Sequence, residues 1–187
     1  MNNYDLNQAF FVAIHKKTTV PSKPLEALRE TIGETNRTVE DFEVERGKVA
    51  EFARAIHDTA EIYFNEAAAH EAGYETIPAP PTFPRTSYFS RYRPEGIDYS
   101  LGFDLGFDRA RVVHGEQKYK YNRPLYVGDV LVGDTTMEEI YQREGRNGGT
   151  MTFAVLRTDF RDKDGEHVLS AYNTRIETGG AIAGESE

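Results

Sequence analysis

The spacing of apolar residues changes along this chain, and the first regular pattern is helical. Between residues 47 and 57 the apolar positions recur at i, i+3, i+4 and i+7: Val49, Phe52, Ala53 and Ile56. This is the period of a helix that buries one face. A second, shorter helix is expected over EAAAHEA, with Asn65 as its N-cap and Gly73 as its left-handed end. The first half of the chain is therefore predicted to hold two helices.

From residue 114 onward the period changes to two. In EQKYKYNRPL, Gln117, Tyr119 and Tyr121 alternate with polar neighbours, which is typical of a half-buried strand. VLVGDTTMEEIYQ, TMTFAVLRTDF and HVLSAYNTRIET predict three more strands, joined through REGRNGG and the turn DKDG. Helices followed by hairpin-linked strands indicate an α+β fold, an antiparallel sheet with helices on one face. The open sheet edges favour a dimer.

Several segments carry no regular period. IPAPPTFP has four prolines in eight residues and forbids a regular helix, and no element is assigned to the aromatic stretch RTSYFSRYRPEGIDYSLGFDLGFDRARVV. Residues 1–38 are predicted to be an N-terminal arm, either a mobile or surface-packed extension or an arm that docks on a partner subunit. The domain is expected over residues 39–178, with a flexible tail at 179–187.

Composition narrows the possible classes. The chain has 187 residues, 39% of them hydrophobic, which is enough for one domain with a buried core. The net charge of −9 argues against nucleic acid as a partner, since phosphate binding needs clustered Lys and Arg. The absence of cysteine excludes disulfides and a thiol nucleophile and suits a reducing cytosol. With no apolar run near roughly 18 residues and no basic leader, a soluble cytoplasmic protein without a membrane span is expected.

Few residues qualify for chemistry. The five histidines include no i, i+4 pair, so no metal site is expected. Gly102 and Gly106 lack the spacing of a phosphate loop. Two segments remain: Asp58, which follows His57 at a predicted helix end, and His114 at the entrance to the strands. The alternatives are an exposed helix terminus for the first and a turn or packing feature for the second.

A family resemblance bears on both segments. FEVERGKVAEFARAIHD, IYFNEAAAHEAGY and IPAPPTF, followed by HGEQKYKYNRPLYVGDVL, resemble the N-terminal, FAS1-like dehydratase type of domain in the MaoC-like family. The resemblance runs from about Val39 to Thr178. It implies a hotdog fold, in which an antiparallel sheet wraps around a central helix and two copies pair into a double hotdog. In this chain IPAPPTFPRTSYF would begin that helix or a shortened replacement for it.

The resemblance also implies an activity and a set of site residues. Active members are (R)-specific enoyl-CoA hydratases or 3-hydroxyacyl-thioester dehydratases, with an Asp and, five residues later, a His. Here Asp58 is kept and Tyr63 stands at the position of the His. A Tyr with a pKa near 10 is a poor base at neutral pH. His114 is a further catalytic candidate, and the thioester and acyl pocket is expected to include four residues: Gly115, Pro80, Thr82 and Phe83.

Three functions follow from this departure. The chain is expected to be a hydratase/dehydratase subunit that pairs with a catalytic MaoC-like hotdog. The alternatives are a self-sufficient homodimer that uses Asp58 with His114 or His57, and a hotdog that binds acyl-CoA without turnover. In each case the ligand is an acyl-CoA or acyl carrier protein thioester, and no other cofactor or metal is expected. The candidates for the phosphate end of CoA, each of which could equally be a solvated surface residue, are Arg85, Arg91, Arg93, Lys118 and Arg123.

Overall fold

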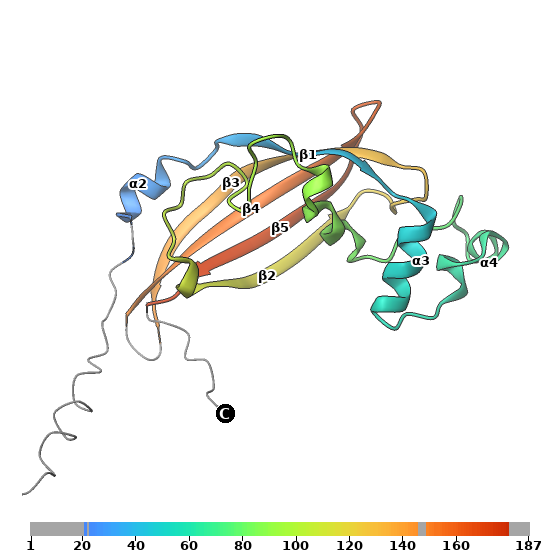
Figure 1. Ribbon diagram of the computed structural model, residues 1–187, viewed down its shortest axis with the longest axis horizontal. Helices are drawn as coiled ribbons and strands as arrows, with labels where there is room; N and C mark the ends of the chain where they lie inside the picture. Colours follow the sequence, from blue (N-terminus) through green and yellow to red (C-terminus); the bar gives the residue numbers. More distant parts are fainter. Residues whose placement is uncertain (1–20, 22, 146–148, 180–187) are drawn as a thin grey trace, which may run out of the picture.

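The computed structural model describes residues 21, 23–145 and 149–179, which form one curved antiparallel sheet with short helices on one face and at one end (Figure 1). The strands lie in the order β1-β3-β4-β5-β2, and every neighbouring pair is antiparallel. Their bounds are β1 Thr35–Glu43, β2 Val112–Tyr121, β3 Val130–Glu144, β4 Thr150–Asp162 and β5 His167–Glu177. The sheet confirms the predicted α+β class.

The four strands predicted from the period of two are confirmed as β2 to β5. Residues alternate between buried and less buried along β3 and β4, as expected for a sheet with one face on the core. Gly128 and Gly165 have φ of 96° and 84° in the turns before β3 and β5, a conformation that glycine adopts without steric cost.

Strand β1 was not predicted, and it corrects the expected domain boundary at residue 38. Its first residue, Thr35, pairs with Thr136 of β3, and Leu28 on helix α2 (Leu25–Arg29) is buried in the core. The described part of the predicted arm therefore belongs to the domain. Two irregularities in the β1–β3 register break the alternation of β1, so its sequence lacks a clear period of two. Residues 1–20, 22 and 180–187, which carry the remaining arm and tail predictions, lie outside the described residues.

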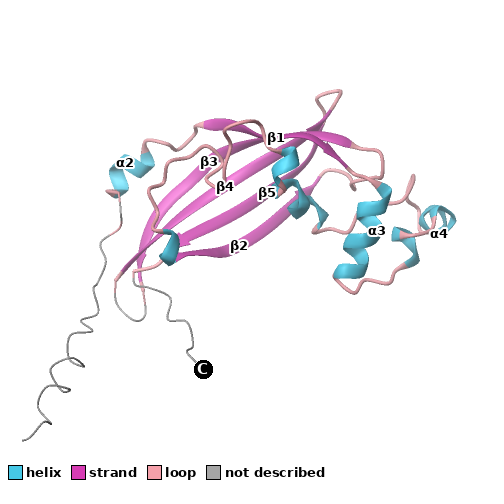
Figure 2. Cartoon of the chain, viewed as in Figure 1, coloured by secondary structure: helices cyan, strands magenta, loops and turns pink. Residues whose placement is uncertain are grey.

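Both predicted helices are present, at the end of the sheet shown in Figure 2. Helix α3 (Arg46–Ala55) buries Val49 and Ala53. Helix α4 (Glu66–Glu71) is capped by Asn65, whose side-chain oxygen accepts hydrogen bonds from the backbone N–H groups of Ala67 (2.9 Å) and Ala68 (3.4 Å). No helix in the described ranges has the length and apolarity needed to cross a membrane.

The segment after α4 replaces a long central helix with single turns. Its 3₁₀ helices are η2 Phe83–Tyr88, η3 Ser90–Tyr92 and η4 Arg109–Arg111, and a further one, η1 Glu61–Tyr63, precedes α4. Prolines before and within η2 remove the backbone donors that a longer helix would need. Phe83 and Tyr92 still fill the core, with ring centroids 5.9 Å and 5.1 Å from that of Phe42. This is the shortened form of the central helix expected from the sequence.

A polar belt divides the core into two hydrophobic clusters. One surrounds Phe42 and Phe83, and the other surrounds Phe103 and Met137. The belt consists of six residues, which come from all five strands: Thr38, Thr135, Thr158, Asn173, Gln117 and His114. Hydroxyl contacts of 2.7 Å link its three threonines, and the Asn173 amide reaches His114 Nδ1 (3.0 Å) and Gln117 Oε1 (3.2 Å).

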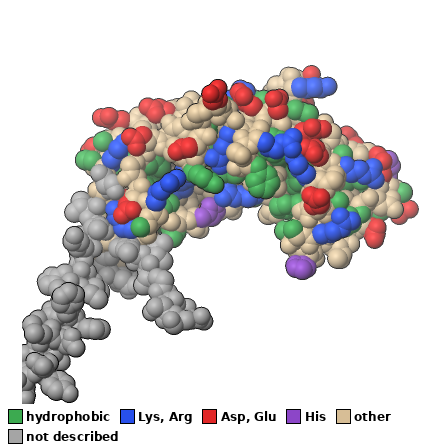
Figure 3. All heavy atoms as spheres, in the orientation of Figure 1, with side chains coloured by type: hydrophobic (Ala, Val, Ile, Leu, Met, Phe, Trp, Pro, Cys, Tyr) green, Lys and Arg blue, Asp and Glu red, His purple; other side chains and the backbone are tan. Residues whose placement is uncertain are grey.

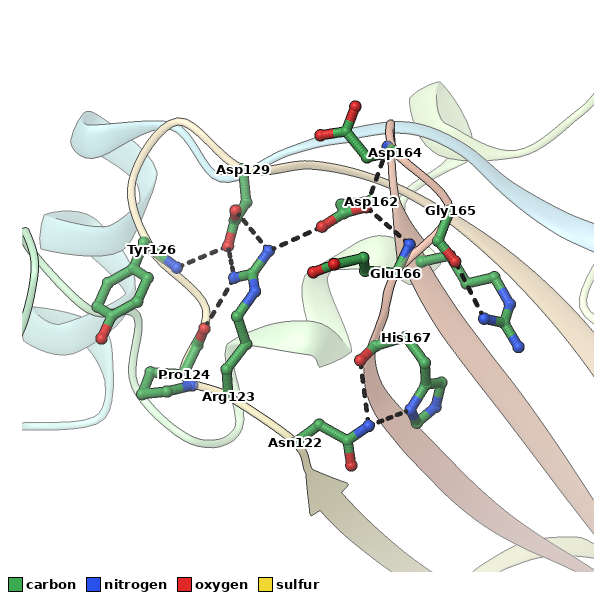
Figure 4. Close-up of polar contacts among 11 residues, drawn as sticks. Asn122, Arg123, Pro124, Tyr126, Asp129, Asp162, Asp164, Gly165, Glu166 and His167 are labelled. Atoms are coloured by element: carbon green, nitrogen blue, oxygen red, sulfur yellow. Dashed lines mark hydrogen bonds and ion pairs between the residues drawn. The ribbon is translucent and has the colours of Figure 1, made fainter.

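Two arginines hold loops to the sheet through ion pairs. In Figure 4 the Arg123 guanidinium lies between the carboxylates of Asp129 (2.7 and 3.0 Å) and Asp162 (3.4 Å), which joins the β2–β3 connection to the β4–β5 hairpin. At the other end of β2, Arg111 Nη2 donates to Glu177 Oε1 over 2.8 Å, and both side chains are buried. The RPLYVGD motif is thus a structural clamp in this chain.

Candidate functional site

The end of helix α3 fixes the backbone of Asp58. The N–H of Asp58 donates to the Ala53 carbonyl (2.9 Å), and the N–H of His57 donates to the Arg54 carbonyl (3.1 Å). His57 has φ of 58°. These features form a Schellman motif in which His57 takes the left-handed position that glycine usually occupies. The chain therefore reverses at His57 and carries Asp58 back toward η1.

Tyr63 lies within range of the charge of Asp58. Asp58 Oδ1 accepts a hydrogen bond from the Ala60 N–H (3.1 Å), and Tyr63 is only 8% exposed. Burial raises the pKa of Tyr63, and the charge of Asp58 adds to this effect. The phenol therefore stays protonated at neutral pH and can donate a hydrogen bond but cannot act as a general base.

No histidine accompanies this pair. In the described part of the chain, no hydrogen bond or ion pair joins Asp58 to His57 or to any other histidine. The same residues contain no group of three or more His, Asp or Glu side chains placed to hold a metal ion. The general base that active MaoC-like domains are expected to carry is thus not supplied beside Asp58.

A separate open cavity of about 310 Å³ lies over β2 and the start of η2. Its lining residues are Thr82, Arg85, His114, Gln117 and Tyr119. Thr82 and His114 were candidate site residues, whereas Asp58 and Tyr63 do not line this cavity. Gln117 and Tyr119 were predicted only as strand residues. The period of two in the sequence indicated which side chains of β2 point inward. It gave no sign that these side chains border a cavity.

A bulge at Gly115 places His114 on the cavity side of β2. The β2–β5 register shifts between His114 and Glu116, so His114 and Gln117 share a face although they are three residues apart. A side chain at position 115 would overlap Ile176. Gly115 thus shapes the cavity through its backbone. Pro80 and Phe83, the other two residues expected in the pocket, are buried and do not line the cavity.

The environment of the cavity keeps His114 and Tyr119 in their neutral forms, next to the positive charge of Arg85. Partial burial lowers the pKa of His114, and the charges of Arg85 and Arg175 lower it further. Its Nδ1 accepts from Asn173, so the neutral ring carries its proton on Nε2. Burial raises the pKa of Tyr119 to about 12. The cavity therefore offers neutral hydrogen-bond donors next to a cationic group.

Comparisons with known proteins agree with this geometry. A family model described as "FAS1-like, dehydratase domain region" matches residues 30–171. A UPF0336 protein of Thermobifida fusca is 35% identical over 157 residues, which cover 83% of this chain and 97% of that protein. A UPF0336 protein of Mycobacterium leprae is 31% identical over 153 residues, covering 82% and 86%.

Two solved complexes share the fold. The C-terminally truncated HadBC complex of Mycobacterium tuberculosis, a 3R-hydroxyacyl-ACP dehydratase, has 28% identity and a TM-score of 0.64, covering 78% of this chain and 96% of that one. The ChsH1–ChsH2 complex of the same organism has a TM-score of 0.68, covering 85% and 91%; at 20% identity it shows the fold alone. This chain belongs to the FAS1-like dehydratase-domain family and has the MaoC-like hotdog fold.

Proposed function

We propose that this chain is a hydratase/dehydratase subunit for 2-enoyl or (R)-3-hydroxyacyl thioesters of CoA or acyl carrier protein. It contributes an acyl-binding wall to a double hotdog, and the other hotdog supplies the catalytic Asp–His pair. The observation that carries this proposal is Tyr63, a buried phenol beside Asp58 at the position of the expected histidine. A phenol with a raised pKa stays protonated at neutral pH, so it cannot serve as the base that water addition needs.

The open edge of the sheet supports a paired assembly. Strand β2 is hydrogen-bonded to β5 on one side only, so its second edge is free to pair within the described residues. Three residues of this edge strand line the cavity: His114, Gln117 and Tyr119. A partner hotdog that docks along β2 would therefore close the cavity and bring its own catalytic pair to the thioester. The HadBC and ChsH1–ChsH2 neighbours were both solved as complexes, which supports this arrangement.

The division of labour follows from the reaction. Hydration adds the hydroxyl of water to C3 of the enoyl thioester and a proton to C2: a base takes one proton from the attacking water, the second proton stays on the new hydroxyl, and an acid delivers a proton to C2. Dehydration reverses both transfers. In this chain Gln117 is held in place, because its amide donates to the Tyr172 carbonyl (3.0 Å) and accepts from Asn173 (3.2 Å). Side chains held in this way can orient the thioester while the partner moves the protons.

A second candidate function is a self-sufficient homodimer. Its support is His114, whose ring borders the cavity next to the free edge of β2. Pairing of two copies along β2 would bring this ring near the other copy. This function also requires Asp58 of the second copy to lie close to the His114 ring of the first.

Hydration of crotonyl-CoA separates the two. The chain alone, a MaoC-like chain encoded beside it, and their mixture are compared by loss of the enoyl-thioester absorbance, with gel filtration to detect a complex. We expect no turnover by the chain alone and at least a tenfold gain in the mixture over the partner alone. Turnover by the chain alone that is lost in Asp58→Asn, but kept in the exposed control Glu61→Gln, would establish the homodimer instead. A mixture no faster than its partner, with no complex, would sink the subunit role.

A further inference from the structure

Three arginines meet on the cavity side of the sheet. Arg85 and Arg93 both lie against Tyr88, with guanidinium carbons 4.0 Å and 5.8 Å from the ring centroid. Arg175 projects from β5 directly opposite His114. We call Arg85, Arg93 and Arg175 the arginine cluster. In Figure 3, Lys and Arg side chains border the hollow between the sheet and the α3–α4 end.

Among the described residues, the arginine cluster forms no ion pair with a carboxylate. No ion pair within 4 Å joins any of its members to Asp or Glu in the ranges that the structure describes, although the chain holds 31 acidic residues. Burial lowers the pKa of Arg175, and the charges of Arg93 and Arg85 lower it too, against opposing contributions from Tyr88 and from Asp98, which makes no ion pair with Arg175 within 4 Å. A desolvated cation among like charges is costly, so the fold alone gives no reason to keep it.

Unsatisfied polar atoms mark the same place. In the described structure, four buried atoms here have no hydrogen-bond partner: Ser87 Oγ, Arg93 Nε, Arg93 Nη2 and Asn173 Oδ1. Ser87 is 1% exposed and Asn173 is 3% exposed. Ser87 and Arg93 line a small void of about 10 Å³ against Thr38 and Thr158, room for about one water. Three of the four unsatisfied atoms are donors, and a set of donors beside positive charge fits an oxyanion.

We propose that the arginine cluster is an oxyanion-binding subsite that takes a carboxylate or phosphate group of the acyl-thioester ligand. The inference rests on the proposed function for the ligand class. Arg85 lines the open cavity and receives the group, while Arg93, which lines the small void, and Arg175, which stands opposite His114 on β5, add positive charge beside it. Guanidinium forks match the geometry of both oxyanions. In a chain of net charge −9 such a cluster also offsets the repulsion that an anionic ligand meets.

Three ligands separate the sources of the oxyanion in calorimetric titrations of the full chain. S-butyryl-N-acetylcysteamine is neutral, S-glutaryl-N-acetylcysteamine adds only a carboxylate, and butyryl-CoA adds the phosphates together with the uncharged remainder of pantetheine and adenosine. The variants are Arg93→Gln, Arg175→Gln and, since its exposed side chain is safe for folding, Arg85→Gln. Arg37→Gln is the matched control, because Arg37 lies outside the cluster and is paired with Asp134. Thermal melts check that each variant folds.

We expect the cluster variants to bind one charged thioester about 10- to 100-fold more weakly, as for the loss of one charge-assisted contact. The neutral thioester should bind as to wild type, and Arg37→Gln should change nothing. Weaker glutaryl binding assigns a carboxylate of the acyl part, and weaker butyryl-CoA binding assigns a carrier phosphate. Equal affinity of wild type and all three cluster variants, or an equal loss with the neutral ligand, would overturn the subsite.

Free glutarate and inorganic phosphate keep the two proposals distinguishable. Wild type that binds either anion through the cluster, but none of the thioesters, would retain the oxyanion site and count against the proposed function. If wild type and the cluster variants bind the thioesters equally well, the proposed function is supported and the oxyanion subsite is contradicted.

Discussion

The chain treats its arginines in two opposite ways. Arg111 is 6% exposed and donates to Glu177, 2% exposed, whereas Arg175 is half-buried, lies near two further arginines and makes no ion pair with a carboxylate among the described residues. Desolvation destabilises the charged form of both side chains, but only Arg111 offsets this cost with an ion pair inside the fold. The difference indicates that the paired arginines stabilise the structure, and that the arginine cluster is kept for a ligand.

Breaking the buried pair should have the largest effect. Arg111→Met leaves the Glu177 carboxylate buried beside an apolar side chain, which costs about 3–5 kcal/mol of unfolding free energy. Urea unfolding at pH 7 measures this loss. The double variant Arg111→Met/Glu177→Leu should regain most of it. A single variant as stable as wild type would remove the contrast between the two kinds of arginine.

The opposite change is expected in the cluster. Arg175→Met removes a desolvated charge without orphaning a partner, so the unfolding free energy should stay the same or rise, by up to about 4 kcal/mol. Arg175→Lys is the matched control, since it keeps the charge and should gain nothing. A loss of more than about 1 kcal/mol in Arg175→Met, on the usual scale of point mutations, would mean that Arg175 stabilises the fold after all.

Loss of the half-exposed Arg123 clamp should change the unfolding free energy by an amount between those of the Arg111→Met and Arg175→Met variants. Arg123→Met is expected to cost about 1 kcal/mol at pH 7, because water screens an ion pair at this exposure. Desolvation alone would raise the pKa of Asp162, but backbone N–H groups of Glu166 and Asp164, with Arg123, lower it overall. Its contribution is therefore present above pH 4 and is lost as the pH falls through the lowered value. The difference between wild type and variant should shrink in acid, which urea melts at pH 7 and about pH 3 would test.

The smallest expected effect is on the titration of His114. Burial and the charges of Arg85 and Arg175 hold its pKa below the usual value, so the folded chain prefers the neutral ring. This preference contributes fully above about pH 6.5 and is lost as the pH falls through the lowered pKa. Arg85→Gln should raise the pKa of His114 toward 6.5 in an NMR titration of the ring protons. An unchanged pKa would show that the charge of Arg85 does not act on His114.

The sequence predicts elements with a clean period better than those that depend on distant contacts. Strands β2 to β5 and both capped helices follow from local patterns. Strand β1 does not, because its buried residues Val39 and Phe42 are three apart across a register shift.

The same limit applies to the site. Asp58 and Tyr63 are close in sequence, so a local motif could single them out, whereas Arg85 on η2 and Arg175 on β5 are 90 residues apart and are neighbours only in the folded chain. Arg85 and Arg93 were candidates for a CoA phosphate, but nothing in the local pattern of β5 marks Arg175. The catalytic roles of Asp58 and His114 stay predictions.

The polar belt has a consequence for how the domain melts. It separates the two hydrophobic clusters, but each cluster takes residues from the same strands, such as Leu131 and Met137 on β3 and Phe160 and Leu156 on β4. Neither cluster can come apart while those strands keep their backbone ladders. The described domain should therefore unfold in one cooperative transition, and probes placed at its two ends should report the same midpoint.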